Sequence, residues 1–389
     1  MEYVRRDITG PDGSYPVEGY VDPPFLPLVD AFCANFAAGI ELGASVAVVR
    51  DGKVVADLWG GYADASRQRR WRHDTIVNMM SVSKGVSAIC IFLLVERGLL
   101  DPQRPVADYW PEFAVNGKAE ITLAQVLDHR AGLPWVTGAQ RGDAYDQDRI
   151  AAAIARQAPL FPPGDAPAYH VLTQGYILAE VVRRVTGKTL GSFYRDEIAA
   201  PLHIDYTIGL READLDRCAT FELPPQAGIL KALLDPDSPE GVYWAQLAEG
   251  ERFNSTAFRT AEIPSANGHG NARAVARLYG MLANGGELDG IRIMRPETID
   301  QLRAERHNLQ DRIRPRHYHQ ASGVVRNSPP VAYMGPNPGA FGHQGAGGAI
   351  GFGDPENGIG FAYGMNYYSP GGEAERRAPL VDAAYAALR

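Results

Sequence analysis

A Ser-x-x-Lys pattern occurs once in the chain, at Ser81-Val82-Ser83-Lys84, where it opens an apolar segment with helical periodicity. Residues three apart on a helix share one face, so the lysine nitrogen can reach the serine hydroxyl. A serine in the first helical turn also has the positive end of the helix dipole behind it and a backbone N–H that the helix does not use. Burial lowers the pKa of a lysine, and the neutral amine can then take the serine proton. This arrangement is typical of a serine nucleophile activated by a lysine.

Lysine is rare in this sequence, which makes its positions informative. Of the 38 basic residues, 33 are arginines and only five are lysines: Lys53, Lys84, Lys118, Lys188 and Lys231. A lysine in a first helical turn opposes the helix dipole and therefore calls for another explanation. A purely structural interpretation, with Ser81 as an N-cap and Lys84 as a solvated side chain, stays open on this motif alone.

Other catalytic and cofactor-binding motifs are absent or incomplete. No serine lies in Gly-x-Ser-x-Gly, and no histidine pair forms His-Glu-x-x-His. Gly187-Lys188-Thr189 lacks the earlier glycine of a phosphate-binding loop, and Gly345-Ala346-Gly347-Gly348 does not complete Gly-x-Gly-x-x-Gly. His317-Tyr318-His319 has no accompanying cysteine or carboxylate cluster, so we predict a solvated loop there. We therefore expect neither a metal nor an organic cofactor.

Two hairpins are predicted, one toward each end of the chain. Asp51-Gly52 separates the apolar runs 44–49 and 54–59, which favours a tight type I′ turn. Residues 346–352 and 359–365 flank a longer turn and are predicted to form the second hairpin. Helical patterns occupy most of the remaining sequence, at 81–97 (ended by Gly98), 121–127, 150–157, 175–185, 271–283 and 380–388.

Strands toward both ends with helices between them predict an α+β protein, in which an α/β layer built from the two ends carries a mainly helical insertion. No internal repeat is visible, and no stretch is rich enough in glycine, proline or serine to act as a linker. Residues 222–259 contain four prolines and few periodic signals. We expect a long, partly helical excursion there that shapes a site.

Composition narrows the class of protein further. The net charge is -8 and no polybasic patch is present, which argues against a nucleic-acid partner. The longest apolar run, 88–95, is far shorter than the ~20 residues of a membrane span, and the first residues lack the apolar core of a signal peptide. Three cysteines, an odd number, argue against a disulfide framework. We expect a soluble cytoplasmic protein with no nucleic-acid and no membrane partner.

Five segments stand in one order along the chain: Asn78-Met79-Met80-Ser81-Val82-Ser83-Lys84-Gly85, Leu127-Asp128-His129-Arg130-Ala131-Gly132-Leu133-Pro134, Pro163-Gly164 before Tyr169, Ser265-Ala266-Asn267-Gly268-His269-Gly270, and Gly342-His343-Gln344-Gly345. Together they resemble the serine β-lactamase-type superfamily, which includes class C β-lactamases, D-alanyl-D-alanine peptidases and family VIII carboxylesterases. The resemblance covers nearly the whole chain and is strongest to the carboxylesterases. It implies a class C β-lactamase-like fold, with an antiparallel sheet flanked by helices and an inserted helical lobe.

The resemblance implies roles for three catalytic residues. The serine of Ser-x-x-Lys is acylated in that family, which implies Ser81, and the lysine partner is Lys84. The second family motif is Tyr-x-Asn, and Tyr169-His170-Val171 keeps the tyrosine while losing the asparagine. Tyr169 is implied as a proton shuttle, with its pKa drawn down from about 10 by Lys84. Without an amide at Val171, one polar contact to an amide-bearing acyl group is missing.

The third family motif, Lys-Thr-Gly in β-lactamases, is replaced by His343-Gln344-Gly345. Ala346 then falls where the family supplies a second oxyanion N–H, beside that of Ser81. The lactamase lysine helps to bind the antibiotic carboxylate, whereas His343 is mostly neutral at pH 7. A packed strand histidine is the alternative for His343, and we favour a site residue because the neighbouring glycines let a substrate approach. We infer a preference for uncharged esters, with weak β-lactam turnover still open.

The sequence thus predicts a two-lobed serine hydrolase. Residues 1–80 and 265–389 are expected to form the α/β lobe, residues 81–264 the mainly helical lobe, and the active site the cleft between them. The expected reaction is hydrolysis of short-chain or aryl carboxylic esters through an acyl-enzyme on Ser81, with a small ester as the partner molecule. A β-lactamase or amidase, an acyltransferase, and a binding or sensing module without turnover remain alternatives.

Overall fold

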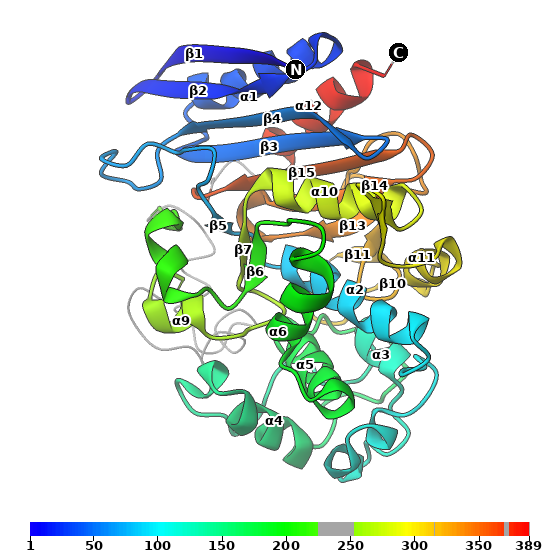
Figure 1. The fold of residues 1–389 in the computed structure, drawn as a ribbon. Coiled ribbons are helices and arrows are strands. Elements are labelled where there is room, and N and C mark those ends of the chain that lie inside the picture. Colours follow the sequence, from blue (N-terminus) through cyan, green and yellow to red (C-terminus); the bar gives the residue numbers. More distant parts are fainter. Residues whose placement is uncertain (225–252, 315, 369–372, 389) are drawn as a thin grey trace.

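The computed structural model describes residues 1–224, 253–314, 316–368 and 373–388. A ten-stranded sheet, in which every neighbouring pair is antiparallel, runs in the order β1-β2-β4-β3-β15-β14-β13-β12-β11-β10 (Figure 1). Segments near both ends of the chain therefore meet in one sheet. Its strands are β1 (Glu2–Gly10), β2 (Gly13–Val21), β3 (Gly43–Arg50), β4 (Lys53–Gly61), β10 (His307–Gln310), β11 (His317–Gln320), β12 (Val325–Arg326), β13 (Phe341–Gln344), β14 (Ile350–Asp354) and β15 (Ile359–Met365).

Helices cover both faces of this sheet (Figure 1). Side chains alternate between the two faces along a strand, and β15 shows both contacts. A Cβ on Gly360 would lie 2.2 Å from the carbonyl oxygen of Ala276 in α10 (Ala272–Ala283), so glycine is required where that helix approaches. The Tyr363 hydroxyl instead bonds Glu41, just after α1 (Leu26–Ala37), on the other face. Helix α12 (Glu373–Ala386) packs against α1.

The segment between the two halves of the sheet is mainly helical, with a second sheet in the order β5-β7-β6. Helix α2 (Val82–Glu96) runs through the middle of this region, and its residues from Val82 to Leu94 are all buried, the polar residues Ser83, Lys84 and Ser87 included. The remaining elements are α3 (Leu123–Leu127), α4 (Gln147–Arg156), α5 (Thr173–Thr186), α6 (Leu190–Tyr194), α9 (Thr256–Thr260), α11 (Pro296–Arg303), β5 (Val77–Asn78), β6 (Tyr206–Ile208), β7 (Gly268–Gly270), and the short hairpin β8 (Glu287–Leu288) and β9 (Ile291–Arg292).

The predicted fold class, α+β with an antiparallel sheet flanked by helices, is confirmed. Strands β3 and β4 form the first predicted hairpin, and Asp51 and Gly52 have the positive φ values, 48° and 76°, that a type I′ turn needs. Gly98, with φ 68°, follows α2 as predicted. The other predicted helices correspond to α3, α4, α5, α10 and α12, with shifted ends. Of the predicted excursion at 222–259, residues 225–252 lie outside the described part of the chain.

Two predictions about strands were wrong. Residues 346–352 do not form one strand, because Gly347 and Gly348 have φ values of 87° and 118° and the chain makes a 3₁₀ turn, η7 (Ala346–Gly348), before β14 begins. His317-Tyr318-His319 is not a solvated loop, since it lies in β11 and pairs with β10. The N-terminal hairpin of β1 and β2 was not predicted, because β1 is an edge strand with mostly exposed and polar residues.

Candidate active site

The turn before α2 places Ser81 at the N-terminus of that helix. Met80 has a left-handed backbone with φ 50°, which costs a residue with a side chain about 1–3 kcal/mol. Asn78 Oδ1 accepts the N–H of Met80 at 2.9 Å, and the Met80 carbonyl accepts the Ser83 hydroxyl at 2.6 Å. These two bonds hold the turn. Ser81 is consequently the N-cap residue, and its own N–H lies outside the helical hydrogen-bond ladder.

Lys84 lies next to Ser81 and is only 1% exposed. Its Nζ is 3.3 Å from Ser81 Oγ, 2.7 Å from the carbonyl oxygen of Val171 and 3.0 Å from that of Ser265. Burial, together with the nearby Arg314 guanidinium, holds the pKa of Lys84 well below its ordinary value. A neutral amine has two N–H bonds, which the two carbonyls accept, and one lone pair, which is left for the serine hydroxyl. The pair can therefore transfer a proton from serine to lysine.

Tyr169 lies beside this pair, just before α5, and is 5% exposed. The Lys84 Nζ is 5.0 Å from the centre of its ring. The expected lowering of the Tyr169 pKa was wrong. Burial raises that pKa above its ordinary value, and the nearby Ser81 hydroxyl and the charges of Arg314 and Arg316 offset this effect only in part. Tyr169 is thus a neutral phenol that can donate a proton.

A segment that sequence reasoning missed contacts Tyr169 from its other side, and its described residues are 307–314 and 316–320. The carboxylate of Asp311 accepts the backbone N–H of Tyr169 at 2.8 Å. The ring of Tyr318 stacks on that of Tyr169, with ring centres 5.7 Å apart and an angle of 17° between the planes. The guanidinium carbon of Arg314 lies 5.0 Å from the centre of the same ring. Sequence spacing carries no signal for these contacts, because Asp311 lies 142 positions from Tyr169.

Strand β13 ends next to the turn that carries the serine. A Cβ on Gly345 would lie 2.2 Å from the carbonyl oxygen of Met79 and 3.1 Å from the Cβ of Met80, so only glycine allows this approach. The Gly345–Ala346 peptide is thereby brought beside Ser81. Ala346 is the first residue of η7, and its N–H is not needed by that turn. The backbone N–H groups of Ser81 and Ala346 are thus not used by the helix and the turn that these residues begin.

His343 and Gln344 lie on opposite faces of β13. His343 is buried on the face toward α2, its Nδ1–H donates to the Gln344 carbonyl at 2.7 Å, and burial lowers its pKa to about 3, so the ring is neutral. The Gln344 side chain is held on the other face: its Nε2 donates to the Val331 carbonyl at 2.8 Å, and its Oε1 accepts from Arg377 at 2.6 Å. Of the predicted site segment, the structure therefore brings His343 and Gly345 close to the Ser81–Lys84 pair and turns Gln344 away.

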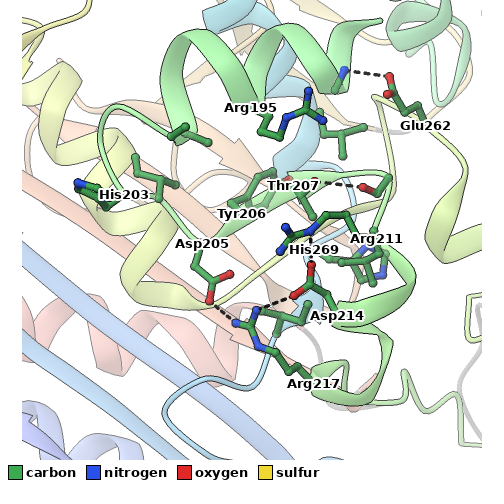
Figure 2. Close-up of a pocket in the computed structure, with 18 residues that line it drawn as sticks. Arg195, His203, Asp205, Tyr206, Thr207, Arg211, Asp214, Arg217, Glu262 and His269 are labelled. Carbon is green, nitrogen blue, oxygen red and sulfur yellow. Dashed lines mark hydrogen bonds and ion pairs between the residues drawn. The ribbon is translucent and has the colours of Figure 1, made fainter.

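The segment Ser265–Gly270 contacts three elements around the site: α5, Lys84 and β5. Ser265 Oγ accepts the Gly175 N–H at 2.8 Å while its carbonyl accepts from Lys84, and His269 in β7 pairs with Asn78 in β5. A pocket of about 500 Å³ is lined by β6 and neighbouring segments, with His269 and Tyr206 in its wall (Figure 2). The Tyr206 hydroxyl bonds Ser83 at 3.2 Å. Ser81, Lys84 and Tyr169 do not line this pocket.

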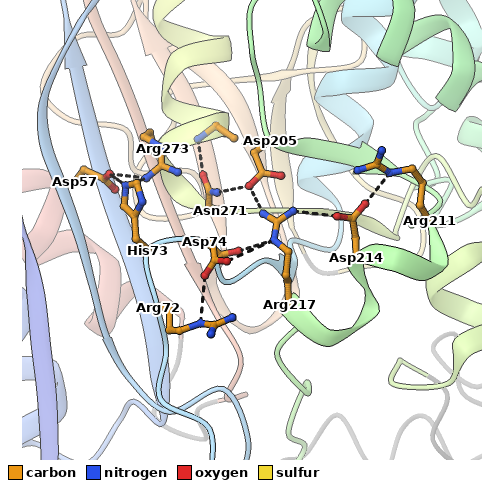
Figure 3. A network of polar contacts seen from close by, with 11 residues as sticks. Asp57, Arg72, His73, Asp74, Asp205, Arg211, Asp214, Arg217, Asn271 and Arg273 are labelled. Atoms are coloured by element: carbon orange, nitrogen blue, oxygen red, sulfur yellow. Dashed lines mark hydrogen bonds and ion pairs between the residues drawn. The ribbon is translucent and has the colours of Figure 1, made fainter.

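A network of ion pairs joins the same region to the large sheet (Figure 3). Arg273 of α10 pairs with Asp57 of β4 at 2.6 Å. Asn271, the N-cap of α10, donates to Asp205 at 3.0 Å, and Asp205 pairs with Arg217. Because the network joins β4, α10 and the residues before β6, we assign it a structural role.

Cys33, Cys90 and Cys218 are buried free thiols. Among the described residues, no group of three His, Cys, Asp or Glu side chains is arranged to hold a metal ion. No helix in the same part of the chain combines the length and the apolar character that crossing a bilayer requires.

The chain belongs to the Beta-lactamase family, whose model matches residues 31–386, and it is a serine hydrolase of the β-lactamase superfamily. The superfamily predicted from the five motifs is confirmed. Among its relatives is "Esterase/beta-lactamase LipL" of Mycobacterium tuberculosis, which is 37% identical over 382 residues that cover 91% of this chain and 83% of the relative.

Two solved structures resemble this one over nearly their whole length. A family VIII carboxylesterase is 39% identical, with a TM-score of 0.87 and coverage of 95% of this chain and 99% of that chain. A penicillin-binding protein homologue from Caulobacter crescentus is 38% identical, with the same TM-score and coverage. A family VIII carboxylesterase and a penicillin-binding protein homologue thus share this fold and more than a third of the aligned sequence.

Proposed function

We propose that the protein is a serine carboxylesterase that hydrolyses short-chain or aryl carboxylic esters through an acyl-enzyme on Ser81. The observation that carries the proposal is the 3.3 Å approach of Ser81 Oγ to the Nζ of Lys84, a buried amine with a depressed pKa. Two similar proteins support the same reaction class: one of 37% identity is named an esterase/β-lactamase, and one of 39% identity is a family VIII carboxylesterase.

Acylation begins with proton transfer. As Ser81 Oγ attacks the ester carbonyl carbon, Lys84 Nζ takes the hydroxyl proton, and the carbonyl oxygen becomes an oxyanion bound by the N–H groups of Ser81 and Ala346. When the intermediate collapses, the carbon–alkoxide bond breaks and Tyr169 donates its phenolic proton to the leaving alkoxide. The protonated Lys84 then returns a proton to Tyr169. Both groups regain their starting forms.

Deacylation follows the same route with water in place of the serine. Lys84 takes a proton from the water as its oxygen attacks the acyl carbon, and the same two amides bind the second oxyanion. Collapse breaks the bond to Ser81 Oγ, which regains a proton from Tyr169, and Lys84 again restores the phenol. The products are a carboxylic acid and free enzyme.

Two neutral residues at the positions of family motifs, His343 and Val171, favour an uncharged ester. His343 is buried and its pKa is lowered to about 3, so it offers no permanent charge to a substrate carboxylate. Val171 stands where the family motif has an asparagine, and its backbone carbonyl is already bonded to Lys84. The site therefore lacks two of the polar contacts that β-lactam recognition uses in the wider family. We propose esters as the main substrates.

A β-lactamase or amidase and an acyltransferase remain the alternatives within the fold. Because amides have poorer leaving groups, a comparison of matched ester and amide substrates separates the first alternative, and product analysis with added alcohol separates the second. A sensing module would release one equivalent of product in a burst and then stop. We also propose that the chain divides into two lobes at residues 81 and 264, with the active site in the cleft between them. We further propose a cytoplasmic location.

The decisive experiment measures initial rates on p-nitrophenyl butyrate and on a chromogenic cephalosporin, with mass spectrometry for an acyl adduct on the peptide that contains Ser81. We expect fast ester turnover that disappears in Ser81→Ala and persists in the control Ser192→Ala, whose serine lies on α6. Rapid cephalosporin turnover with slow ester cleavage would instead identify a β-lactamase.

A further inference from the structure

The direction of the Ala346 N–H depends on a turn that has little rigidity of its own. Between β13 and β14 the chain passes through Gly345, Ala346, Gly347 and Gly348. The carbonyl of Ala349 accepts the Gly345 N–H at 2.7 Å, and the Gly345 carbonyl accepts the Gly348 N–H at 3.2 Å. Glycines at φ 87° and 118° can adopt many other conformations at similar cost. Contacts from outside the turn must therefore fix it.

Arg376, on α12, supplies one such contact. Its Nη1 donates to the carbonyl of Gly347 at 3.0 Å and to that of Tyr367 at 2.7 Å, and its Nη2 donates to the carbonyl of Ile40. Its Nε lies 3.6 Å from the carboxylate of Glu41. One guanidinium thus joins the turn after β13, the end of β15 and the end of α1.

Arg377, the next residue on α12, reaches the strand before the turn. Its Nη2 donates to Oε1 of Gln344 at 2.6 Å, and Nε2 of the same glutamine donates to the Val331 carbonyl at 2.8 Å. Gln344 follows His343 directly and precedes Gly345. The two neighbouring arginines of α12 therefore hold the oxyanion segment on both sides of Gly345.

The burial of these arginines has a large cost that their contacts must offset. The side chain of Arg376 is 0% exposed and Arg377 is 2% exposed. A buried guanidinium is tolerated only where hydrogen bonds and opposite charge surround it, and Glu41, itself 2% exposed, lies beside Arg376. A Cβ on Gly348 would lie 2.7 Å from Cδ of Arg376, so the arginine also fills the space beside the turn.

We propose that Arg376 and Arg377 are positioning residues for the oxyanion site, which they hold through the Gly347 carbonyl and the Gln344 side chain. This inference rests on the proposed function of the Ser81 site. The oxyanion forms only as the reaction proceeds, so an amide that points in the right direction stabilises the transition state more than the bound substrate. Loss of this support lowers kcat and leaves KM nearly unchanged.

The test is a double-mutant cycle between Arg377→Met and Gln344→Leu in the full chain, measured with p-nitrophenyl butyrate. Each single variant is expected to lower kcat about 10- to 100-fold with KM within about twofold, and the double variant to lose no more than the larger single loss. Arg377→Lys, whose ammonium can still donate to Gln344, is expected to recover part of kcat. Arg104→Met, at an exposed i,i+4 ion pair with Asp108, is the control.

Benzeneboronic acid gives a second readout that a merely structural role does not move. Its tetrahedral adduct with an active-site serine mimics the oxyanion intermediate, so its affinity is expected to fall by the same factor as kcat. If folded Arg377→Met keeps wild-type kcat and boronate affinity, or if the losses of the two single variants multiply in the double variant, the inference is wrong. A wild-type protein without Ser81-dependent ester turnover would instead overturn the proposed function.

Discussion

The carboxylate of Asp311 accepts the backbone N–H of Tyr169 at 2.8 Å and also accepts the N–H groups of Ile313 at 2.9 Å and Arg314 at 2.8 Å. The buried carboxylate of Asp311 thus connects Tyr169 to the turn that contains Arg314, whose guanidinium lies over the Tyr169 ring. Because Tyr169 lies beside both Ser81 and Lys84, a displacement of this backbone changes the distances along the proposed proton path.

Replacement of Asp311 by alanine is expected to lower kcat about tenfold and to reduce the free energy of unfolding by about 1–3 kcal/mol, because the Tyr169 amide loses its buried acceptor. Asp311→Asn keeps one oxygen acceptor and is expected to lose less. Steady-state kinetics and urea unfolding measure both effects. Asp165→Ala, which removes an exposed ion pair with Arg312, is the control and should change neither quantity appreciably.

Tyr169→Phe removes only the phenolic hydroxyl and keeps the ring that stacks on Tyr318. We expect kcat on p-nitrophenyl butyrate to fall about 10²–10⁴-fold with no loss of thermal stability, since proton transfer to the leaving group is lost and the packing is retained. Tyr318→Phe, which retains the same stack, should stay close to wild type. Full activity in Tyr169→Phe would exclude that residue from the mechanism.

The pH dependence of kcat/KM follows from Lys84 and Tyr169 as a coupled pair. The pKa of Lys84 is lowered, so the active neutral amine forms as pH rises and activity rises with it; the pKa of Tyr169 is raised, so the phenol is lost only at strongly alkaline pH. Arg314→Gln removes a repulsive charge, which should raise the Lys84 pKa and move the acidic limb of the profile to higher pH. If the acidic limb of the profile does not shift in Arg314→Gln, burial alone sets the pKa of Lys84.

Five buried histidines have a lowered pKa and make stability depend on pH. Burial lowers the pKa values of His170, His269 and His343 to about 3, whereas an unfolded histidine titrates near 6.5. The unfolded chain therefore binds protons that the native chain does not, and stability falls as pH drops from about 7 toward 5, by about 2 kcal/mol for each histidine. The pKa of the buried Glu41 carboxyl is raised, so Glu41 favours the folded state as pH drops. The total stability therefore does not isolate the contribution of the histidines.

The comparison of wild type with His269→Gln isolates one of these histidines. Urea unfolding at pH 7 and pH 5 should show a loss of stability between the two pH values that is smaller by about 2 kcal/mol in the variant. Equal losses in the two proteins would mean that His269 is protonated in the native state at pH 5.

Local patterns predicted the parts of the site that lie close together in sequence. The Ser81–Lys84 pair follows from helical spacing, and the Asp51-Gly52 turn follows from its need for positive φ. The hydrogen bond from Tyr169 to Asp311 and that from Arg376 to Gly347 depend on how distant segments pack, and no spacing rule encodes them. The pKa of Tyr169 was mispredicted for the same reason, because its burial depends on residues such as Tyr318 that are remote in sequence.

The N-terminal hairpin could have been predicted from the sequence of its turn. Pro11-Asp12-Gly13 is a typical turn sequence between β1 and β2. The polar, exposed residues of β1 hide the alternation by which strands are usually recognised. The turn η7 was wrongly predicted as part of a strand. Its sequence is apolar and rich in glycine, but the positive φ values of Gly347 and Gly348 prevent a strand there.

Gly345→Ala tests whether the close approach of β13 to the serine turn sets the oxyanion geometry. The added methyl would meet the carbonyl oxygen of Met79 at 2.2 Å, a backbone atom that cannot move without displacing Ser81. We expect kcat to fall at least about 10²-fold, the magnitude of losing one oxyanion donor. Gly339→Ala is the matched control, because its nearest neighbour, a side-chain oxygen of Glu356, would lie 3.4 Å away. Kinetics on p-nitrophenyl butyrate, with circular dichroism to verify folding, measure the difference. Equal activity in the two variants would show that the Ala346 amide does not depend on this contact.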